Sequence, residues 1–290
     1  MELRQLRYVV AVAETRNFTR AAARCFVAQS ALSRQIGNLE RELGVKLFAR
    51  TSRRVEPTPA GEAFLVGARQ SIEAAERAVA DAAAAVGEVR GRLTIGIIPT
   101  VVAVDIAEVL QRFRGQHPRV RVGLHVGASD VMTAQVAAGE LDAAFLGLPG
   151  GTEPQGVAAL ELGRERLVAA VPPTHELAHH DTVTLRRLAE SPFVDFPAGS
   201  PGRAQSDQAF EAAELEREVA YEMMSVELMT RLVSRGLAVA LLPAAIARAT
   251  PSVRALRVDG APSRVEYLIW SRFNPTPATR AFLSPFGPRP

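Results

Sequence analysis

The sequence predicts an α/β protein with an all-α winged helix-turn-helix at its N-terminus, then one long linker helix and two α/β lobes. Three observations predict this arrangement. Residues 17–48 form two short amphipathic patterns joined by a tight turn. Residues 59–89 are almost all good helix formers. From residue 91 onward, apolar strand patterns alternate with helical patterns, as in parallel sheets with helical crossovers.

Length and composition fit a globular protein of two or three domains, with 290 residues, 48% hydrophobic and 22% charged. The single cysteine, Cys25, excludes an internal disulfide framework and fits a reducing compartment. No export signal pattern and no apolar run long enough for a bilayer is present in the sequence. We therefore expect a cytoplasmic protein with no membrane partner.

Charge is unevenly distributed along the chain. Residues 1–60 carry eleven basic and five acidic side chains, a net charge of +6, and the whole chain carries +3, so the remainder is acidic. A basic N-terminal module on an acidic body is typical of a module that binds a polyanion. A basic face that is merely solvated is the alternative.

Three helices are expected in the N-terminal module. Apolar residues at helical spacing in the first 13 positions predict the first. Thr19 is expected to cap the second helix, which runs through Phe26. The third is expected over 29–43, ended by Gly44 in the left-handed conformation.

The third helix has the chemistry of a DNA recognition helix. Its inward positions are apolar, while its N-terminal outward positions are Gln29, Ser30, Ser33 and Arg34. Arginine can donate two hydrogen bonds to guanine, glutamine pairs with adenine, and serine bonds several base edges. We therefore expect these four residues to contact DNA.

A short two-stranded wing is expected after this helix, over 45–48 and 50–58. Arg50, Arg53 and Arg54 gather there, where phosphate contacts would lie. These three residues complete the predicted DNA-binding set.

The stretches FTRAAARCFVAQSALSRQIGNLERELGVKLFAR and RRVEPTPAG closely resemble the winged helix-turn-helix of LysR-type transcriptional regulators. The resemblance implies a homo-oligomeric transcription factor, a homodimer or homotetramer, that responds to a small-molecule effector. It implies double-stranded DNA with a two-half-site operator as a partner and makes RNA polymerase a candidate partner.

The linker helix is expected to begin at Pro59, with Thr58 as its cap, and to run to about residue 90. Its apolar positions form a narrow seam of the coiled-coil kind: Phe64, Ala68, Ile72, Ala75, Val79, Ala82 and Val86. A helix of this length needs a partner surface in water. A second subunit is the favoured partner, and the chain's own domain is the alternative; the resemblance also implies a dimer linker.

The division expected from these patterns is 1–58 for the DNA-binding domain, 59–90 for the linker helix and 91–290 for the α/β region. The strand order βαβαβ predicts a first lobe at 91–161, which the chain rejoins at 266–290, and a second lobe at 162–265. The stretches RFRGQHPRV, GELDAAF, FVDFPAGSPG and RLVSRGLAVALLPA resemble the family's effector domain, which implies a bilobal fold like that of periplasmic binding proteins.

Ligands of α/β sheets bind at the carboxyl ends of the strands, where helix N-termini attract anions. The candidates for effector binding lie at such ends or beside them: Thr100, Ala128, Ser129, Phe196, Arg203, Met223, Ser225 and Pro243. Ser129 is expected to cap the helix that follows it, and a helix from Val101 to Phe113 is expected before it. Since Arg203 is the nearest cation, a small, partly apolar carboxylate or an aromatic metabolite is the predicted effector.

Catalysis is not expected. His175, His179, His180 and Asp181 lie in a proline-rich loop whose spacing fits no closed zinc site, so a solvated loop is favoured over a metal site. Ser200 lacks a nucleophile-elbow pattern, and no phosphate-binding glycine motif is present. We expect no enzyme activity, no metal and no cofactor.

The leading hypothesis is a regulator whose DNA contacts are controlled by a metabolite bound between the two lobes. A nucleoid-type architectural protein would use the basic module but not the lobes. A small-molecule enzyme or transport component would use the lobes but leave residues 1–60 unexplained.

Overall fold

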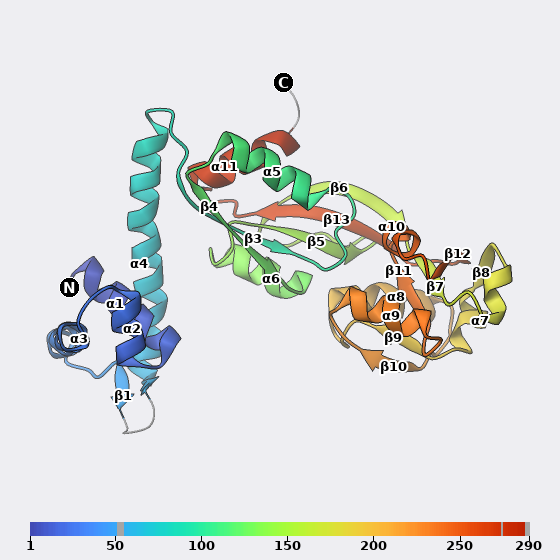
Figure 1. The fold of residues 1–290 in the computed structure, drawn as a ribbon, viewed down its shortest axis with the longest axis horizontal. Helices are drawn as coiled ribbons and strands as arrows, with labels where there is room; N and C mark the ends of the chain where they lie inside the picture. The colour runs from blue at the N-terminus through green and yellow to red at the C-terminus, as the bar shows by residue number, and fades with distance from the viewer. Residues whose placement is uncertain (51–54, 274, 288–290) are drawn as a thin grey trace. The chain divides into compact units, whose positions relative to one another are not determined.

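The computed structural model describes residues 1–50, 55–273 and 275–287, and the chain forms two compact units, Met1–Glu88 and Val89–Pro290. The first unit is a winged helix-turn-helix followed by a long helix (Figure 1). Its elements are α1 (Leu3–Thr15), α2 (Phe18–Arg24), α3 (Gln29–Leu43), β1 (Phe48–Arg50), β2 (Val55–Pro57) and α4 (Pro59–Ala84).

The predicted third helix and its glycine end are confirmed, since Gly44 has φ +71°. The second helix differs from the prediction at both ends. Its cap is Asn17, whose Oδ1 accepts from the Arg20 amide at 2.9 Å, so Thr19 lies inside the helix. The helix ends before Phe26, which has φ +55° and a side chain that is 95% exposed. A residue in the left-handed region cannot continue a right-handed helix, so Phe26 belongs to the turn.

A buried carboxylate joins α3 to the wing. Glu40 is only 3% exposed, and its carboxylate accepts hydrogen bonds from the amides of Leu47 (3.0 Å) and Phe48 (3.3 Å) and from Lys46 Nζ (3.0 Å). Burial opposes ionisation of Glu40, but these three donors together hold its pKa below its ordinary value. The strand β1 therefore starts at a fixed distance from α3.

The linker helix α4 begins as predicted, because the Thr58 hydroxyl accepts from the Gly61 amide at 3.0 Å. It ends at Ala84, short of the expected residue 90, and Gly87 then has φ +82°. Its N-terminal half packs on the winged-helix core through Phe64 and Leu65. In its C-terminal half, Val79 is more than half exposed, as is Val86 just beyond the helix.

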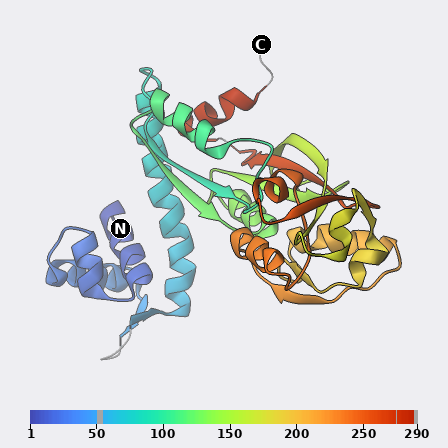
Figure 2. The same cartoon turned by 45° about the vertical axis from the view of Figure 1, so that its right-hand side comes forward.

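In the second unit, the first lobe is built on a five-stranded sheet of order β4-β3-β5-β13-β6. The strands β3, β4 and β5 are parallel, as predicted, whereas β13 is antiparallel to both of its neighbours. Helices α5 and α11 cover one face and α6 covers the other (Figures 1 and 2). The bounds are β3 (Gly91–Ile97), α5 (Ile106–Gln116), β4 (Val120–Val126), α6 (Ser129–Ala137), β5 (Ala143–Pro149), β6 (Ala158–Arg166), β13 (Ser263–Trp270), α11 (Pro277–Leu283) and the short turn η2 (Ser284–Phe286).

The second lobe holds a four-stranded sheet of order β11-β7-β12-β8 beside the parallel pair β10-β9. Helices α7 and α8 pack on one side and α9 and α10 on the other. The bounds are β7 (Val168–Val171), η1 (Glu176–His179), β8 (Thr182–Thr184), α7 (Leu185–Ala189), β9 (Phe193–Asp195), α8 (Pro201–Ala212), β10 (Val219–Glu222), α9 (Val226–Ser234), β11 (Ala240–Leu242), α10 (Ala244–Ala249) and β12 (Arg254–Asp259).

Two crossings join the lobes, one between β6 and β7 and one between β12 and β13. At the crossings the amide of Leu167 donates to the carbonyl of Pro262 at 3.0 Å, so the two segments lie side by side. The sequence-based division placed the crossings after residues 161 and 265. Both β6 and β13 extend beyond those points in the first sheet, because their pairing continues to Arg166 and Ser263.

The helix expected from Val101 begins only at Ile106. The carboxylate of Glu266 accepts the amides of Val102 and Ala103 at 3.1 to 3.2 Å, which holds this segment out of a helix. Asp105 then caps α5 by accepting from the Glu108 amide. Within the described residues, no helix is both long and apolar enough to cross a membrane.

Replacing the buried carboxylate, Glu40→Ala, should destabilise the first unit by about 1–3 kcal/mol, because two buried amides lose their acceptor. Hydrogen exchange of peptides covering residues 29–50 in the full chain measures the loss. Because the pKa of Glu40 is lowered by folding, its contribution is present above the ordinary carboxyl pKa and is lost as the pH falls through the folded-state value.

The difference between the parent and the Glu40→Ala variant should therefore shrink on acidification. Glu42→Ala, at an exposed carboxylate of the same helix, is the matched control and should cost only about 0–1 kcal/mol. Equal effects of the two substitutions would contradict the structural role of Glu40.

Candidate nucleic-acid interface and ligand cavity

The N-terminal end of α3 presents the residues that the sequence analysis selected. Gln29, Ser30 and Arg34 are exposed, and Ser33 is half-buried. The cap residue, Ala28, has no side-chain hydrogen bond, so the first amides of α3 are available to an outside acceptor. Such a helix end can contact a phosphate while its neighbouring side chains reach base edges.

Of the three predicted wing residues, only Arg50 lies within the described part of the chain. Arg50 belongs to β1, which pairs with β2 in antiparallel register, but its side chain is not described. Arg53 and Arg54 lie outside the described residues. Their role as phosphate contacts stays a prediction.

A cavity of about 350 Å³, part of it open to solvent, lies between the two lobes of the second unit. Both lobes supply its walls: Ile98, Pro99, Thr100, Gly127, Ala128, Ser129 and Gly147 from the first, and Phe196, Ser200, Gly202, Gln205 and Met224 from the second.

Four of the eight predicted effector residues line this cavity, namely Thr100, Ala128, Ser129 and Phe196. The other four, Arg203, Met223, Ser225 and Pro243, are not among its lining residues. Ser225 caps α9 by accepting from the Leu228 amide, Met223 packs in the second lobe's core, and Pro243 precedes the short helix α10. Met224, the next residue along the chain, lines the cavity in place of Met223.

The helix α6 enters the cavity wall without a side-chain cap. The expectation that Ser129 caps it is wrong: the cap position is Ala128, and Ser129 is the first helical residue. The Ser129 hydroxyl instead donates to the carbonyl of Gly147 and accepts from its amide, both at 3.1 Å. A serine committed to the neighbouring strand cannot satisfy its own helix, so the first amides of α6 are left for another partner.

An arginine that the sequence analysis did not select lies directly behind the cavity. Arg264, on β13, is 2% exposed and donates to the hydroxyl (3.0 Å) and the carbonyl (2.8 Å) of Thr100. It also donates to Glu266, and its Nε lies 3.2 Å from Glu165 Oε1. Burial raises the pKa of Glu165, which Arg264 opposes. The guanidinium thereby fixes Thr100 in the cavity wall.

The signal that could have revealed this arginine is its strand pattern. In SRVEYLIW, the arginine and the glutamate are two residues apart in an otherwise apolar strand, so both point to one face of the sheet. A pair of opposite charges at such positions indicates a buried ion pair.

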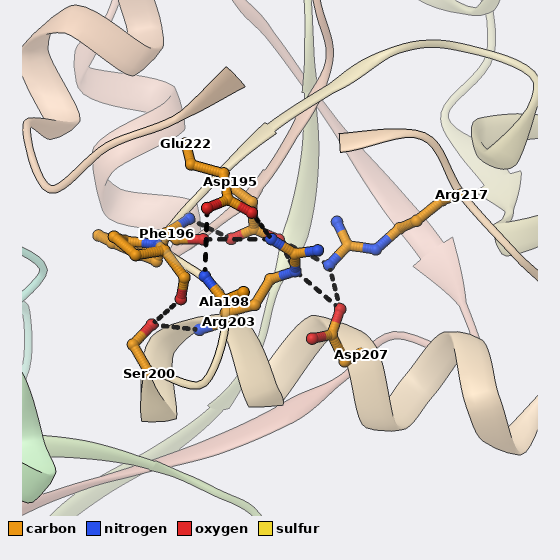
Figure 3. A network of polar contacts seen from close by, with 9 residues as sticks. Asp195, Phe196, Ala198, Ser200, Arg203, Asp207, Arg217 and Glu222 are labelled. Atoms are coloured by element: carbon orange, nitrogen blue, oxygen red, sulfur yellow. Dashed lines mark hydrogen bonds and ion pairs between the residues drawn. The ribbon is translucent and has the colours of Figure 1, made fainter. Parts of the chain in front are cut away.

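A second ionic network supports the wall contributed by the second lobe (Figure 3). Asp195 is buried and lies 2.8 Å from Arg217, whose guanidinium stacks over the rings of Phe193 and Phe210 at 4.9 and 5.0 Å. Burial raises the pKa of Asp195, although Arg217 and the Phe196 amide oppose this. The network thus carries charge close to the base of the cavity wall.

Arg203 extends this network to the start of α8. Its Nε donates to Asp207 at 2.8 Å, and its Nη1 donates to Glu222 at 2.9 Å and to the carbonyl of Phe196 at 3.3 Å. The Ser200 hydroxyl caps α8 by accepting from the Arg203 amide at 3.3 Å (Figure 3). Arg203 is therefore committed to Asp207 and Glu222, with Asp195 4.0 Å away, and its role here is to position the segment that carries Phe196 and Ser200.

The histidine-rich loop shows local bonding only. His175 accepts from the Leu177 amide at 3.2 Å, and its other ring nitrogen lies 3.2 Å from the Ser191 hydroxyl. In the part of the chain that the structure describes, no group of three metal-ligating side chains comes together.

Comparison with known protein families identifies both units of the chain. The description "Bacterial regulatory helix-turn-helix protein, lysR family" matches residues 3–62, and "LysR substrate binding domain" matches residues 87–286. The chain belongs to the LysR family. Its second unit is therefore the ligand-binding domain of a LysR-type regulator.

Similar proteins cover nearly the whole chain. The Hca operon transcriptional activator HcaR of Escherichia coli (strain K12) is 34% identical over 288 residues, which cover 98% of this chain and 96% of that protein. A probable hydrogen peroxide-inducible genes activator of Mycobacterium avium is 35% identical over 239 residues, 82% and 76% of the two chains. The crystal structure of full-length CbnR complexed with its target DNA has a TM-score of 0.73 at 28% identity and covers 98% of each chain.

This LysR-family chain is a DNA-binding transcriptional regulator with an effector-binding domain. Operator DNA, a small-molecule effector and further copies of itself are its partners. The fold class expected from the sequence, a winged helix-turn-helix with a linker helix and a bilobal α/β domain, is confirmed.

Removing the buried carboxylate of the second lobe, Asp195→Ala, should destabilise the second unit by about 2–4 kcal/mol, because Arg217 would lose its buried counter-charge and keep only Asp207, which is 47% exposed. Thermal unfolding of the full chain measures this. Glu222→Ala removes a partner of Arg203 that is 43% exposed and should cost only about 0–1 kcal/mol. A similar loss for both would show that Arg217 does not depend on Asp195.

Proposed function

We propose that this regulator binds its operator through the N-terminal end of α3 and that a small metabolite, held in the cavity between the lobes, controls that binding. The observation that carries the proposal is a cavity built from both lobes that is bordered by an uncapped helix N-terminus. A ligand that contacts both lobes at once binds the closed arrangement more tightly than the open one. It can therefore shift a conformational equilibrium.

The DNA contacts we propose are Gln29, Ser30, Ser33 and Arg34 to bases. Arg50, Arg53 and Arg54 would contact phosphates from the wing. The exposed positions of the first set and the basic charge of the unit support this assignment. The exposed apolar side chains of Val79 and Val86 support a linker seam that pairs with a second subunit.

We also propose that the chain has no enzymatic activity and acts in the cytoplasm. The relatives are named as transcriptional regulators. Among the described residues that line the cavity, no nucleophilic side chain lies beside a general base, and hydrolytic or transfer chemistry needs both. The hydroxyl of Ser200, one of the cavity-lining residues, donates to the Pro197 carbonyl at 2.7 Å.

A peroxide-responsive regulator is a second candidate, because one similar protein is named as a probable hydrogen peroxide-inducible genes activator. Cys25 weighs against it. It is the single cysteine of the chain, so no disulfide can form within one subunit. Burial raises the pKa of this thiol, although Arg24 opposes the shift, and a raised pKa lowers the reactive thiolate fraction.

The direct test is sequencing of genomic DNA fragments captured by the purified protein at near-physiological salt, with and without a metabolite extract. A few sites with symmetric half-sites, whose occupancy responds to the extract, would support the proposal. Diffuse capture without a shared motif would instead favour an architectural protein that binds phosphates alone.

Arg34→Ala should weaken binding to the captured operator by about 1–3 kcal/mol and leave binding to random DNA nearly unchanged, because it removes a base contact. Titrations of both DNAs at one salt concentration measure the difference. Arg112→Ala, which removes an exposed arginine of α5 and thus the same charge, is the control and should change neither. An equal loss on both DNAs would remove Arg34 from the base contacts.

Cys25→Ser should leave the response to the metabolite extract intact and should not remove any response to hydrogen peroxide, because the thiol is predicted to be no sensor. Operator occupancy after peroxide treatment provides the readout. A peroxide response that disappears in the variant would favour the second candidate.

A further inference from the structure

The cavity wall contains more unpaired hydrogen-bonding capacity than a closed apolar pocket would. The first source is the start of α6, where Ala128 occupies the cap position and supplies no acceptor. The amides of Ser129, Asp130 and Val131 precede the first helical bond, which runs from Met132 to the Ala128 carbonyl. An N-terminus of a nine-residue helix with no cap leaves donors and a positive dipole end for an anion.

The second source is the Thr100 hydroxyl. Thr100 is 5% exposed and lines the cavity, and its Oγ1 accepts from Arg264 Nη1 at 3.0 Å. Since that bond occupies a lone pair, the hydroxyl proton is left to donate, and no acceptor for it exists among the described residues. A charged donor behind the hydroxyl makes it a stronger donor. Thr100 is thus a second donor suited to a carboxylate.

The third source lies on the wall from the second lobe and is a hydrogen-bond acceptor, whereas the first two are donors. Gln205 of α8 is 5% exposed and lines the cavity, and its Nε2 donates to the Gly147 carbonyl at 3.2 Å. That bond fixes the direction of the amide. Nothing in the described part of the chain donates to the Gln205 Oε1. Gln205 Oε1 is not among the fully buried atoms that lack a partner, so a ligand in the cavity can reach it and supply the missing donor.

The charges around the cavity limit the ligand to a single negative charge. No charged side chain is among its described lining residues. The nearest buried cation, Arg264, already faces the carboxylates of Glu266 and Glu165, and Arg203 faces Asp207 and Glu222. A second carboxylate in the cavity would lose its hydration without gaining a counter-ion. Besides these polar groups, the cavity wall has the apolar side chains of Ile98, Phe196 and Met224.

We propose that the effector is a small monocarboxylate with an apolar body and a neutral hydroxyl group, whose carboxylate binds the α6 N-terminus and Thr100 and whose hydroxyl donates to Gln205. This assignment rests on the proposed function, because it names the ligand class of the same cavity. Gln205 is the specificity-determining residue of the set, since it distinguishes a hydroxylated acid from the plain acid.

Two scaffolds test the class by calorimetry with the full chain. On the aromatic scaffold the probes are the hydroxy acid 4-hydroxybenzoate, the plain acid benzoate, the uncharged ester methyl 4-hydroxybenzoate and the dicarboxylate terephthalate. On the aliphatic scaffold they are the hydroxy acid 6-hydroxyhexanoate and the plain acid hexanoate. On at least one scaffold, the hydroxy acid should bind about tenfold more tightly than the plain acid, which is the size of one hydrogen bond to a buried acceptor. The uncharged ester and the dicarboxylate should bind more weakly than the hydroxy acid. A dicarboxylate or an ester that binds best would overturn the proposal.

Ala128→Asp gives two effects of opposite sign. An aspartate at the cap position supplies the missing carboxylate, so it should raise the melting temperature by about 2–4 °C and abolish binding of the hydroxy acid. Ala28→Asp is the matched control, because it is the same change at the uncapped start of α3, and it should leave binding of the probe unaltered. Unchanged probe affinity in the Ala128→Asp variant would remove the α6 N-terminus from the site.

Gln205→Met keeps the length of the side chain and removes its carbonyl. It should remove the tenfold preference for the hydroxy acid, so that both acids bind with about equal affinity, while the plain acid binds as it does to the parent. A purely structural role of Gln205 would weaken both probes equally, and that result would overturn its assignment. The comparison of two ligands in one variant is independent of any loss of stability.

Failure of the ligand class and failure of the proposed function are distinguishable. If every probe is inert but a metabolite extract still shifts the melting temperature and the operator affinity, the class is overturned and the proposed function stands. If neither the probes nor the extract has any effect, both are overturned.

Discussion

The buried guanidinium of Arg264 is the interaction on which the arrangement of the ligand cavity depends. It lies on β13 just after the chain returns from the second lobe, and it bonds both the hydroxyl and the carbonyl of Thr100. Its partner Glu266 holds the amides of Val102 and Ala103. The path of the loop between β3 and α5 is therefore set by two residues that lie more than 160 positions further along the chain.

This constraint links the cavity to the crossings between the lobes. Arg264 is next to Ser263, whose carbonyl accepts from the Gly150 amide, and Glu165 is the penultimate residue of β6, the strand that leads into the second lobe. Buried ion pairs are costly to break and rigidly oriented when satisfied, so the loop that carries Thr100 moves with the crossing strands. On the other lobe, Arg203 and Asp195 hold the start of α8 in the same way. A ligand that contacts both walls therefore acts on two stiff elements, which suits a domain whose task is to convert binding into a change of conformation.

The sequence predicted those parts of the fold that rest on local patterns. The bounds of α3 and the start of α4 were predicted from apolar spacing and caps. The start of α5 could not be predicted, because the Glu266 carboxylate from β13 accepts the amides of Val102 and Ala103, where the helix was expected to begin. The role of Ser129 was predicted wrongly, because serine at a strand end reads as a cap, whereas here Gly147 of a neighbouring strand takes its hydroxyl.

The candidate cavity was predicted in its location and only in part in its chemistry. Strand ends locate the cleft, so Thr100, Ala128 and Phe196 were found, but capping residues such as Ser225 give the same pattern without facing the cavity. Gln205 carries no signal in the sequence, because a glutamine within a helix is usually solvated. Its burial depends on how α8 meets β5, which is a tertiary contact that no local pattern contains.

The central claim is that the N-terminus of α6 is completed by the ligand rather than by the protein. Site-resolved hydrogen exchange of the Asp130 and Val131 amides, with and without a bound effector, tests it most directly. The account predicts that both amides exchange rapidly in the free protein and become protected when the ligand binds, because the carboxylate accepts their hydrogen bonds. Amides that are already protected in the free protein, or that stay unprotected when the ligand is bound, would contradict it.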